Sequence, residues 1–259
     1  MSFFEGGVQK TCSLCLAEKT LKKSHAIANS IFKKIFRADG GKAIVLTLNE
    51  QDISYSSDSW WQYQLCGDCE RLLNDKYEQY SLLVLRGHAG RVKKLKKGVS
   101  FNGIDQRKLN MFFLSILWRA STSRHEAYSS VFLGRDMDEY LRNCLFNNIK
   151  IPIGSISVRL SRLCDKSEVH AFSLDSLKGL IVSPFFNGCD YCYAFEGFLV
   201  RISPPGIKLS KRSGVGVIHS NKKIMLVPFE CIFDVPELHE LLMINYGKHI
   251  EGKSRVSED

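Results

Sequence analysis

The sequence predicts an α+β protein in two parts, a small N-terminal part organised by cysteines and a larger C-terminal part with helices and a mainly antiparallel sheet. Three observations support this class. Two Cys-x-x-Cys pairs lie within residues 12–69, apolar residues recur at helical spacing over 105–117, and after Pro152 apolar and polar residues alternate as they do in strands. We place the first part at 1–86, a basic linker at 87–104, the second part at 105–250 and a disordered polar tail at 251–259.

Composition limits the classes of protein to consider. Of the 259 residues, 44% are hydrophobic and 24% are charged, as is usual for a globular protein with a buried core. The first residues lack the basic segment and apolar core of a signal peptide, and no apolar run is long enough to cross a bilayer. We therefore expect a cytoplasmic protein without membrane contact. The net charge of +9 is compatible with nucleic acid as a partner, although many soluble proteins are mildly basic.

The two cysteine pairs predict a metal site. Cys12 and Cys15 form the first pair, and Cys66 and Cys69 form the second. Four thiolates at this spacing can surround a structural Zn²⁺ in tetrahedral geometry. The alternative is two redox-active pairs, but such pairs normally open a helix within a strand-helix-strand pattern, and the first pair does not.

The segments around the cysteines are short. We expect Ser24 to cap a helix over about residues 25–37, and strands at 43–48, 53–56 and 60–64. The second cysteine pair leads into a helix with an apolar stripe formed by Leu73, Tyr77, Tyr80 and Val84. A metal-binding turn, a hairpin and a second turn that opens a helix together make a treble-clef finger, in which the metal substitutes for a larger core.

The linker is strongly basic. Residues 86–97 contain no acid, and their cations include Arg91, Lys93, Lys94, Lys96 and Lys97. Such a run is either the solvated face of a linker or a segment that contacts phosphates.

The C-terminal part should begin with a central helix. Asp105 is expected to cap it, and Leu109, Phe112, Phe113 and Ile116 give it an apolar surface. A further helix is expected over 136–146, and Pro236 should begin the last one. The strands are expected at 153–160, 170–174, 180–183, 191–202, 215–219 and 224–227, the last two as a hairpin across the turn at 220–223.

His25 is the first candidate for catalysis. A histidine between a turn and a helix could take a proton from water and activate it for attack on a phosphodiester, with a second cation stabilising the charge that develops. The same histidine could also cap the helix or replace a cysteine as a zinc ligand.

The N-terminal motifs resemble those of a known family. The segments Thr11–Cys15, Leu21–Ile27 and Leu65–Glu70 are similar to the zinc-containing HNH endonucleases, and closest to a bacterial branch with Cys-x-x-Cys, Ser-His-x-Ile and Cys-x-x-Cys-Glu. The firm resemblance covers about residues 11–80, and Leu114–Ala120 is also reminiscent of that branch. It implies that His25 is the general base and that the four cysteines hold a structural zinc rather than the catalytic ion.

The sequence departs from the family pattern at the other catalytic positions. Ser24 stands where an acidic or histidine metal ligand is usual, and Glu70 stands where asparagine follows the last cysteine. Glu78 lies near the place of the last ligand. Glu70 and Glu78 could form an altered site for Mg²⁺ or Mn²⁺, since hard cations accept carboxylates readily. Alternatively, Glu70 favours the helix N-terminus and Glu78 is solvent-exposed.

Cys189 and Cys192 form a third Cys-x-x-Cys. With Cys164, His170, Cys231 or His239 they could bind a second zinc. However, the flanking residues read as strands, where positions three apart face opposite sides, so buried free cysteines are the other interpretation.

Taken together, the sequence predicts a metal-dependent endonuclease that acts on nucleic acid, DNA rather than RNA, in a defence system such as phage defence or in a mobile element. Lys22, Lys23, Lys33, Lys34 and the basic run at 91–97 would contact phosphates. The alternative is an inactive zinc-finger module that binds nucleic acid or a partner protein. The two differ in whether His25 and the two glutamates converge on one open cavity.

Overall fold

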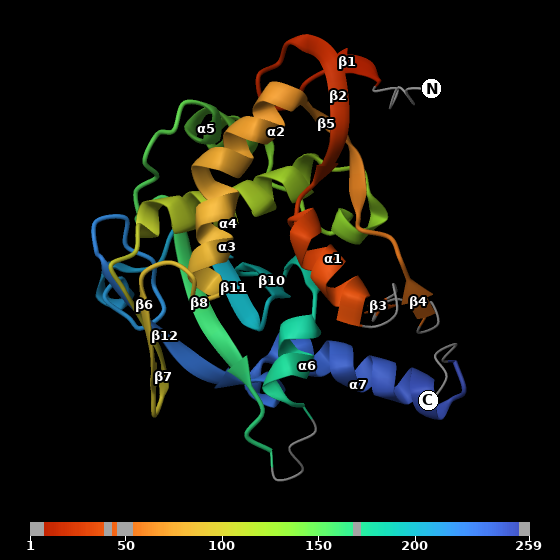
Figure 1. Cartoon of the computed structure of the whole chain (residues 1–259), viewed down its shortest axis with the longest axis vertical. Coiled ribbons are helices and arrows are strands. Elements are labelled where there is room, and N and C mark those ends of the chain that lie inside the picture. The colour runs from red at the N-terminus through yellow and green to blue at the C-terminus, as the bar shows by residue number, and fades with distance from the viewer. Residues whose placement is uncertain (1–7, 39–42, 46–53, 168–171, 254–259) are drawn as a thin grey trace.

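The computed structural model describes residues 8–38, 43–45, 54–167 and 172–253, and it confirms the α+β class with mainly antiparallel sheets (Figure 1). The N-terminal sheet consists of β1 (Gln9–Thr11), β2 (Glu18–His25) and β5 (Trp61–Cys66). Between β2 and β5 the chain forms α1 (Asn29–Ala38) and the small pair β3 (Ala43–Val45) and β4 (Ser54–Ser56). β2 therefore pairs directly with a strand that follows it by more than thirty residues, with His25 opposite Trp61.

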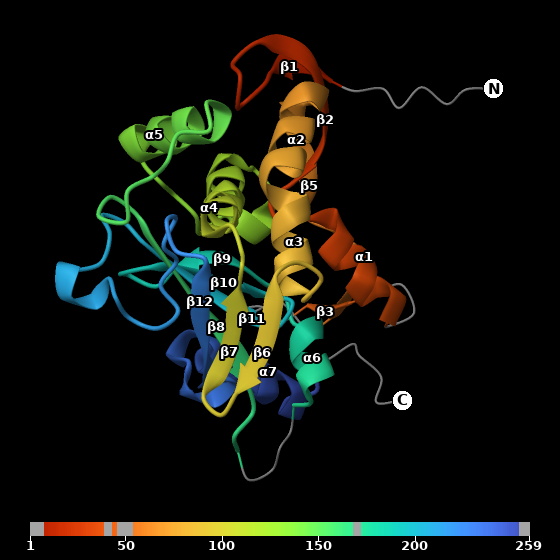
Figure 2. The same ribbon diagram turned by 60° about the vertical axis from the view of Figure 1, so that its left-hand side comes forward.

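A long helical rod follows β5. It comprises α2 (Gly67–Leu73), the π-helical segment η1 (Asn74–Glu78) and α3 (Gln79–Leu85), and it runs beside α1 in both Figure 1 and Figure 2. Its buried residues include the expected Leu73, Tyr77 and Val84. The remaining helix of the N-terminal half, α1, buries Ile31, Phe32 and Ile35 on one face.

A seven-stranded sheet forms the C-terminal half. Its order is β6-β7-β12-β8-β11-β10-β9, and β12 with β8 is its parallel pair. The strands are β6 (Arg91–Leu95), β7 (Gly98–Asn102), β8 (Ser157–Cys164), β9 (Val182–Phe186), β10 (Tyr191–Phe195), β11 (Phe198–Ser203) and β12 (Ile224–Cys231).

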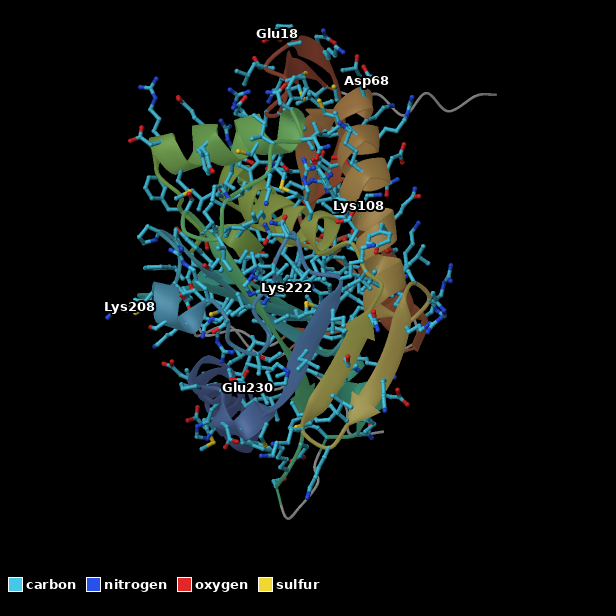
Figure 3. The ribbon with its side chains drawn as sticks, turned by 90° about the vertical axis from the view of Figure 1, so that its left-hand side faces the viewer. Glu18, Asp68, Lys108, Lys208, Lys222 and Glu230 are labelled. Atoms are coloured by element: carbon cyan, nitrogen blue, oxygen red, sulfur yellow. The ribbon has the colours of Figure 1, made fainter. Side chains whose placement is uncertain are left out.

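Helix α4 (Gln106–Thr122) lies at the centre of the molecule. Asp105 caps it as expected, because its carboxylate accepts from the backbone N–H groups of Arg107 and Lys108. All residues from Leu109 to Ala120 are buried, as is typical of a helix that is enclosed on every side. The side chain of Lys108 lies over the ring of Tyr80 in α3, which joins the start of α4 to the helical rod (Figure 3).

The core is continuous across the two halves. One buried cluster includes residues near the cysteines, such as Leu14, residues of α4, and Tyr193 and Phe195 of the sheet. Ala194 and Leu199 face the other side of the sheet and join a second cluster with α7. The other helices are α5 (Arg135–Phe146), α6 (Leu174–Gly179), α7 (Pro236–Ile250) and the 3₁₀ turns Glu126–Tyr128, Leu209–Lys211 and Ile232–Asp234. No helix in the described ranges is long and apolar enough to span a bilayer.

Several expected elements differ from those observed. Ser24 does not cap a helix, because it lies within β2 and its Oγ accepts from the N–H of Leu65 at 3.0 Å. The segment 87–104 contains the hairpin β6–β7, and 191–202 is divided by a turn at Glu196 and Gly197. The expected strand at 215–219 is reduced to one antiparallel bridge between Val217 and Arg159 of β8, and β12 pairs with β7 and β8. Of the expected strand 170–174, residues 170 and 171 lie outside the described residues, and Leu174 begins α6.

Candidate functional site

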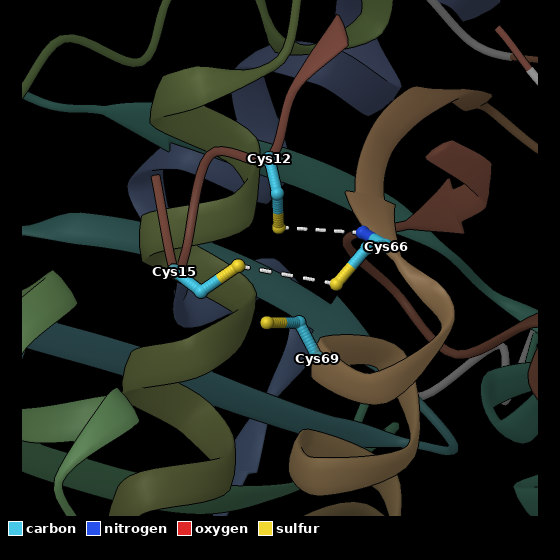
Figure 4. Close-up of side chains that lie close together, drawn as sticks. All are labelled: Cys12, Cys15, Cys66 and Cys69. Atoms are coloured by element: carbon cyan, nitrogen blue, oxygen red, sulfur yellow. Dashed lines mark hydrogen bonds between the residues drawn. The ribbon is translucent and has the colours of Figure 1, made fainter. Parts of the chain in front are cut away.

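The four cysteines come together as the sequence predicts. Cys12 and Cys15 lie in the turn between β1 and β2, Cys66 ends β5, and Cys69 lies in the first turn of α2. Their sulfur atoms all lie within 4.8 Å of one another and point toward a common centre (Figure 4). A tetrahedral zinc with ~2.3 Å bonds places its sulfur ligands about 3.8 Å apart, so a small contraction completes the site.

Backbone contacts hold the sulfurs in place. The N–H of Cys66 donates to the Sγ of Cys12 at 3.3 Å, and the N–H of Leu16 donates to the carbonyl of Cys12. Leu16 has a φ of 61°, a left-handed conformation that closes the turn after Cys15. A donor–sulfur contact of this kind stabilises a thiolate, which is the form that binds metal.

The charges at the four sulfurs also favour a cation. A hydrogen bond from the Cys69 thiol, with backbone N–H groups, lowers the pKa of Cys12 to about 4, despite burial. The same bond and burial raise the pKa of Cys69, and burial raises the pKa of Cys66. Four neighbouring thiols cannot all ionise without a positive charge among them. Cys12, Cys15, Cys66 and Cys69 therefore fit a structural metal ion such as zinc.

The same hairpin and helical rod position His25, Glu70 and Glu78. His25 is the last residue of β2, Glu70 lies one residue after Cys69 in α2, and Glu78 ends the π-helical segment. All three line one cavity of about 400 Å³, together with Lys23, Ala28, Asn29, Arg71, Asn74 and Arg119. The structure thus brings together the three predicted catalytic residues, which come from separate elements.

The π-helical segment explains why the two glutamates share one face. In a regular helix of 3.6 residues per turn, positions eight apart differ in direction by about 80°. The wider i→i+5 turn of Asn74–Glu78 takes more residues per revolution and reduces that difference. Glu70, Asn74 and Glu78 consequently all reach the cavity. Single π-helical turns occur frequently at functional sites.

Arg119 of α4 joins the predicted catalytic residues to one another. Its side chain is 3% exposed; Nη2 donates to Glu70 Oε2 at 3.1 Å, and Nη1 lies 3.8 Å from Glu78 Oε2. Nη1 also donates to the backbone carbonyl of His25 at 2.7 Å. Burial raises the pKa of Glu78, whereas the charge of Arg119 lowers it. Arg119 is thus the positive centre of the cavity.

His25 is half-buried and neutral at pH 7. Burial, followed by the positive charge of Arg119, lowers the pKa of its imidazole to about 4. Its Nε2 is 3.0 Å from the Oγ of Ser59. If Nε2 carries the proton and donates to Ser59, Nδ1 is the basic atom. At pH 7 the imidazole is unprotonated and has a free lone pair, and burial with the charge of Arg119 makes it a weaker base than a free imidazole.

A hard divalent cation does not fit the cavity as it stands. Within the described ranges, only the four cysteines bring three or more ligand atoms of His, Cys, Asp or Glu close enough for one ion. Glu70 and Glu78 are instead paired with Arg119. The expected Mg²⁺ or Mn²⁺ site is therefore not supported by the donor set.

The predicted phosphate-binding lysines lie in different settings. Lys23 lines the cavity and lies over the ring of Trp61 at 4.3 Å, and Lys22 beside it is exposed. Lys33 is exposed on α1, whereas Lys34 pairs with Glu196 of the β10–β11 turn. The hairpin β6–β7 exposes Arg91, Lys93, Lys94, Lys96 and Lys97, and none of them has an ion-pair partner in the described part of the chain.

Sequence reasoning missed Arg119, Ser59 and the nearby pair of His125 and Asp58. His125 Nε2 lies 2.9 Å from Asp58 Oδ2, next to Ser59 in the chain. Arg119 carries a recognisable signal, since a cation within the long apolar run of α4 must find anions when it is buried. Ser59 and Asp58 carry no such signal, because they lie in a polar segment before Trp60.

The third Cys-x-x-Cys does not form a second cluster. Cys192 is buried in β10, where its Sγ accepts from the side chain of Asn187, and Cys189 is exposed in the preceding turn. Among the residues that the structure describes, Cys12, Cys15, Cys66 and Cys69 are the cysteines that could share an ion. His170, one of the expected partners, lies outside the described residues.

Comparisons of this chain with protein-family models, with curated proteins and with solved structures found no match. The resemblance to HNH endonucleases therefore rests on the motifs of the sequence alone.

Proposed function

We propose that the chain is an HNH-like endonuclease that cleaves nucleic acid at the cavity around Arg119, with His25 as the general base. The observation that carries this proposal is that His25, Glu70 and Glu78 line one cavity. A merely structural histidine and two unrelated surface glutamates have no reason to meet.

The charges of the cavity suit a phosphodiester. Its walls carry the cations Lys23, Arg71 and Arg119 against the carboxylates Glu70 and Glu78, which leaves an excess of one positive charge. Arg119 Nε is also buried without a hydrogen-bond partner among the described residues. An unpaired buried donor is unfavourable, and an anion in the adjacent cavity would offset that cost. These features support binding of a phosphate group.

The proposed reaction is attack of water on phosphorus. Neutral His25 takes the proton of the water, and the water oxygen bonds to phosphorus as the bond to the leaving oxygen breaks; the leaving oxygen takes a proton from solvent. Arg119 and Lys23 stabilise the additional negative charge of the transition state, a role for fixed cations in a partly dry site. Ser59 and the contact of Arg119 with the His25 carbonyl orient the imidazole. No step uses a divalent cation, because the carboxylates are engaged with Arg119.

The four cysteines support this site from outside. We propose that they hold zinc in a treble-clef finger, with β2 and β5 as its hairpin and α2 as its helix. Zinc would fix the end of β5 and the start of α2, and so the position of Glu70 relative to His25. The exposed cations of the β6–β7 hairpin would contact the nucleic-acid backbone beyond the cavity.

The test is nicking of supercoiled plasmid DNA by the full-length, zinc-loaded protein. We expect His25→Ala to abolish nicking and His239→Ala, on the far helix α7, to leave it unchanged. Nicking that is equal in both variants would refute the role of His25. Reactions with and without added Mg²⁺ or Mn²⁺ test the cation, and nicking that requires either ion would refute the metal-free step while retaining the endonuclease.

A second candidate function is a binding module without catalysis. The observation that favours it is that both carboxylates are paired with Arg119, as in a purely structural network. This function predicts binding of DNA that depends on the β6–β7 hairpin, with no nicking under any of the conditions above. Mobility shifts on the same plasmid fragments, recorded beside the nicking assay, separate the two functions.

A further inference from the structure

A second cavity lies at the opposite end of the helical rod from the cysteines. It has a volume of about 520 Å³ and is lined by residues of α3, the hairpin β6–β7, the strands β8 and β11, and the helices α1 and α6. Figures 1 and 2 show these elements near one another. This volume is in the range of sites for small organic ligands, roughly 300–1,000 Å³. Its residues belong to neither the cysteine cluster nor the cavity around Arg119.

Four cations surround this cavity. They are Lys34, Arg86, Arg162 and Lys178, and Glu196 is the only acid among the described residues that line it. The Glu196 side chain is 5% exposed, and its two oxygens lie 2.9 Å from Lys34 Nζ and 2.7 Å from Arg86 Nη2. One carboxylate is thus shared by two cations, and the residues that line the cavity carry an excess of three positive charges.

Arg162 is the best placed of these cations to bind an anion. Its guanidinium lies over the Phe198 ring at 4.5 Å, and Nη1 donates to the backbone carbonyl of Glu196 at 2.6 Å. Within the described ranges no carboxylate lies within 4.0 Å of it. A partly buried cation that rests on an aromatic ring and a carbonyl has lost water without forming a direct ion pair. Burial lowers its pKa, and the nearby charge of Glu196 opposes that effect only in part.

Lys178 adds a partly exposed charge to the lining of the cavity. Its partner is Asp175, whose side chain is 90% exposed and does not line the cavity. An exposed pair of this kind contributes little free energy, so Lys178 can turn to a ligand at small cost.

Apart from Gly87 and His88, the rest of the wall is apolar. Leu85, Val92, Val99, Phe101 and Phe198 all contribute, and Val92 is 44% exposed although it lies opposite buried Phe101 in the hairpin. A bare inorganic anion would leave this apolar surface in contact with water. A ligand that carries an oxyanion on an apolar body would cover both parts of the site.

We propose that this cavity binds a small phosphorylated ligand of the nucleoside monophosphate class. The phosphate contacts Arg162 and Lys178, and the ring lies against Leu85, Val92 and Val99. The site is independent of the endonuclease proposal. Its elements belong to both halves of the chain, so a bound ligand would add contacts between α3 and the sheet.

The test is calorimetric titration of the full-length, zinc-loaded protein with AMP, inorganic phosphate and adenosine. We expect AMP to bind at least about tenfold more tightly than phosphate or adenosine, because it alone engages both parts of the site. Arg162→Gln and Lys178→Gln should each weaken AMP binding by about tenfold or more. Arg135→Gln, which removes an exposed cation from α5, is the matched control and should change nothing.

Arg162→Gln also removes contacts to Phe198 and Glu196 and so could unfold the hairpin turn. Lys178→Gln has no such effect, because its partner is exposed, and it decides the question if Arg162→Gln does not fold. Lys23→Gln, in the cavity around Arg119, should leave AMP affinity unchanged. The proposal is refuted by absence of AMP binding up to about 10 mM, by equal affinity for AMP and phosphate, or by a loss confined to Lys23→Gln.

Discussion

Replacing Arg119 by methionine removes the guanidinium that joins α4 to β2 and to the helical rod. Arg119 is 3% exposed, and the side chains of Glu70 and Glu78 are 26% and 21% exposed. Removal of one partner from a buried ion pair costs roughly 3–5 kcal/mol, because the other charge stays behind unpaired. Water reaches both glutamates in part, which favours the lower end, about 3 kcal/mol. Loss of the donor to the His25 carbonyl adds about 1 kcal/mol.

The assay is urea unfolding of zinc-loaded wild type and Arg119→Met at pH 7. A loss of ~3–4 kcal/mol lowers the midpoint by about 1 M or more, given slopes of roughly 1–3 kcal/mol/M. Arg135→Met is the control; Arg135 is 87% exposed and pairs with Glu139 four residues away. Such exposed pairs contribute at most about 0.5 kcal/mol.

The pH dependence of the loss identifies its cause. Burial already raises the pKa of Glu78, and without Arg119 the lowering effect of that charge disappears. A carboxyl whose pKa is raised on folding binds its proton more readily in the folded state, so stability is regained as pH falls. The deficit of Arg119→Met should therefore be greatest at pH 7 and shrink toward pH 5. A deficit no larger than that of Arg135→Met, or one independent of pH, would refute the network.

Three other predictions concern the metal, His25 and the hairpin. Elemental analysis should find one zinc per chain, and Cys69→Ser should lose it and unfold at a lower temperature, because metal binding to such a cluster contributes directly to folding; a variant that keeps full zinc content contradicts the cluster. The pKa of His25 is lowered to about 4, below the ~6.5 of an unfolded chain, so the unfolded state binds its proton first and stability is lost as pH falls between these values, by about 3 kcal/mol in all. Urea unfolding at pH 7 and pH 4 should show that extra loss in wild type but not in His25→Gln. For the β6–β7 hairpin, Lys94→Gln with Lys97→Gln should reduce the salt dependence of DNA binding by about two phosphate contacts, and an unchanged slope in mobility shifts would exclude the hairpin from the interface.

The cysteine cluster was predictable because spacing alone fixes much of its geometry. Two residues between the cysteines of a pair suffice for a turn that presents both sulfur atoms to one ion. The second pair does so at the start of a helix, whatever the pairing of the strands before it. The helix over 105–119 was predictable for a similar reason, since its Asp cap and apolar spacing are local.

The sheet was harder to predict because its pairs are made across long distances in sequence. Strand β6 is rich in basic residues, and the place of the β6–β7 hairpin in the sheet depends on β12, more than 120 residues later. Segment 215–219 has strand-like alternation, but β12 pairs with β7 and β8 instead. Hydrophobic periodicity and strand propensity do not determine which strands pair with one another.

The sequence predicted the helix that carries Glu70 and Glu78, but it placed His25 at the start of a helix, whereas His25 ends β2. The shared direction of the Glu70 and Glu78 side chains depends on the π-helical segment Asn74–Glu78, which no residue pattern in the sequence predicts. Arg119, which pairs with both glutamates, comes from α4, about forty residues after Glu78. Only the folded structure shows that its guanidinium lies where a divalent cation was expected.

The pH profile of single-turnover plasmid nicking tests the central claim, that a neutral His25 in the cavity around Arg119 is the base. With a pKa of about 4 for His25, nicking after subtraction of the His25→Ala background should stay nearly constant from pH 8 down to about pH 5.5 and then fall. An ordinary imidazole with a pKa near 6.5 would lose about tenfold by pH 5.5. A midpoint near 6.5, or nicking that is absent throughout this range, would contradict the account.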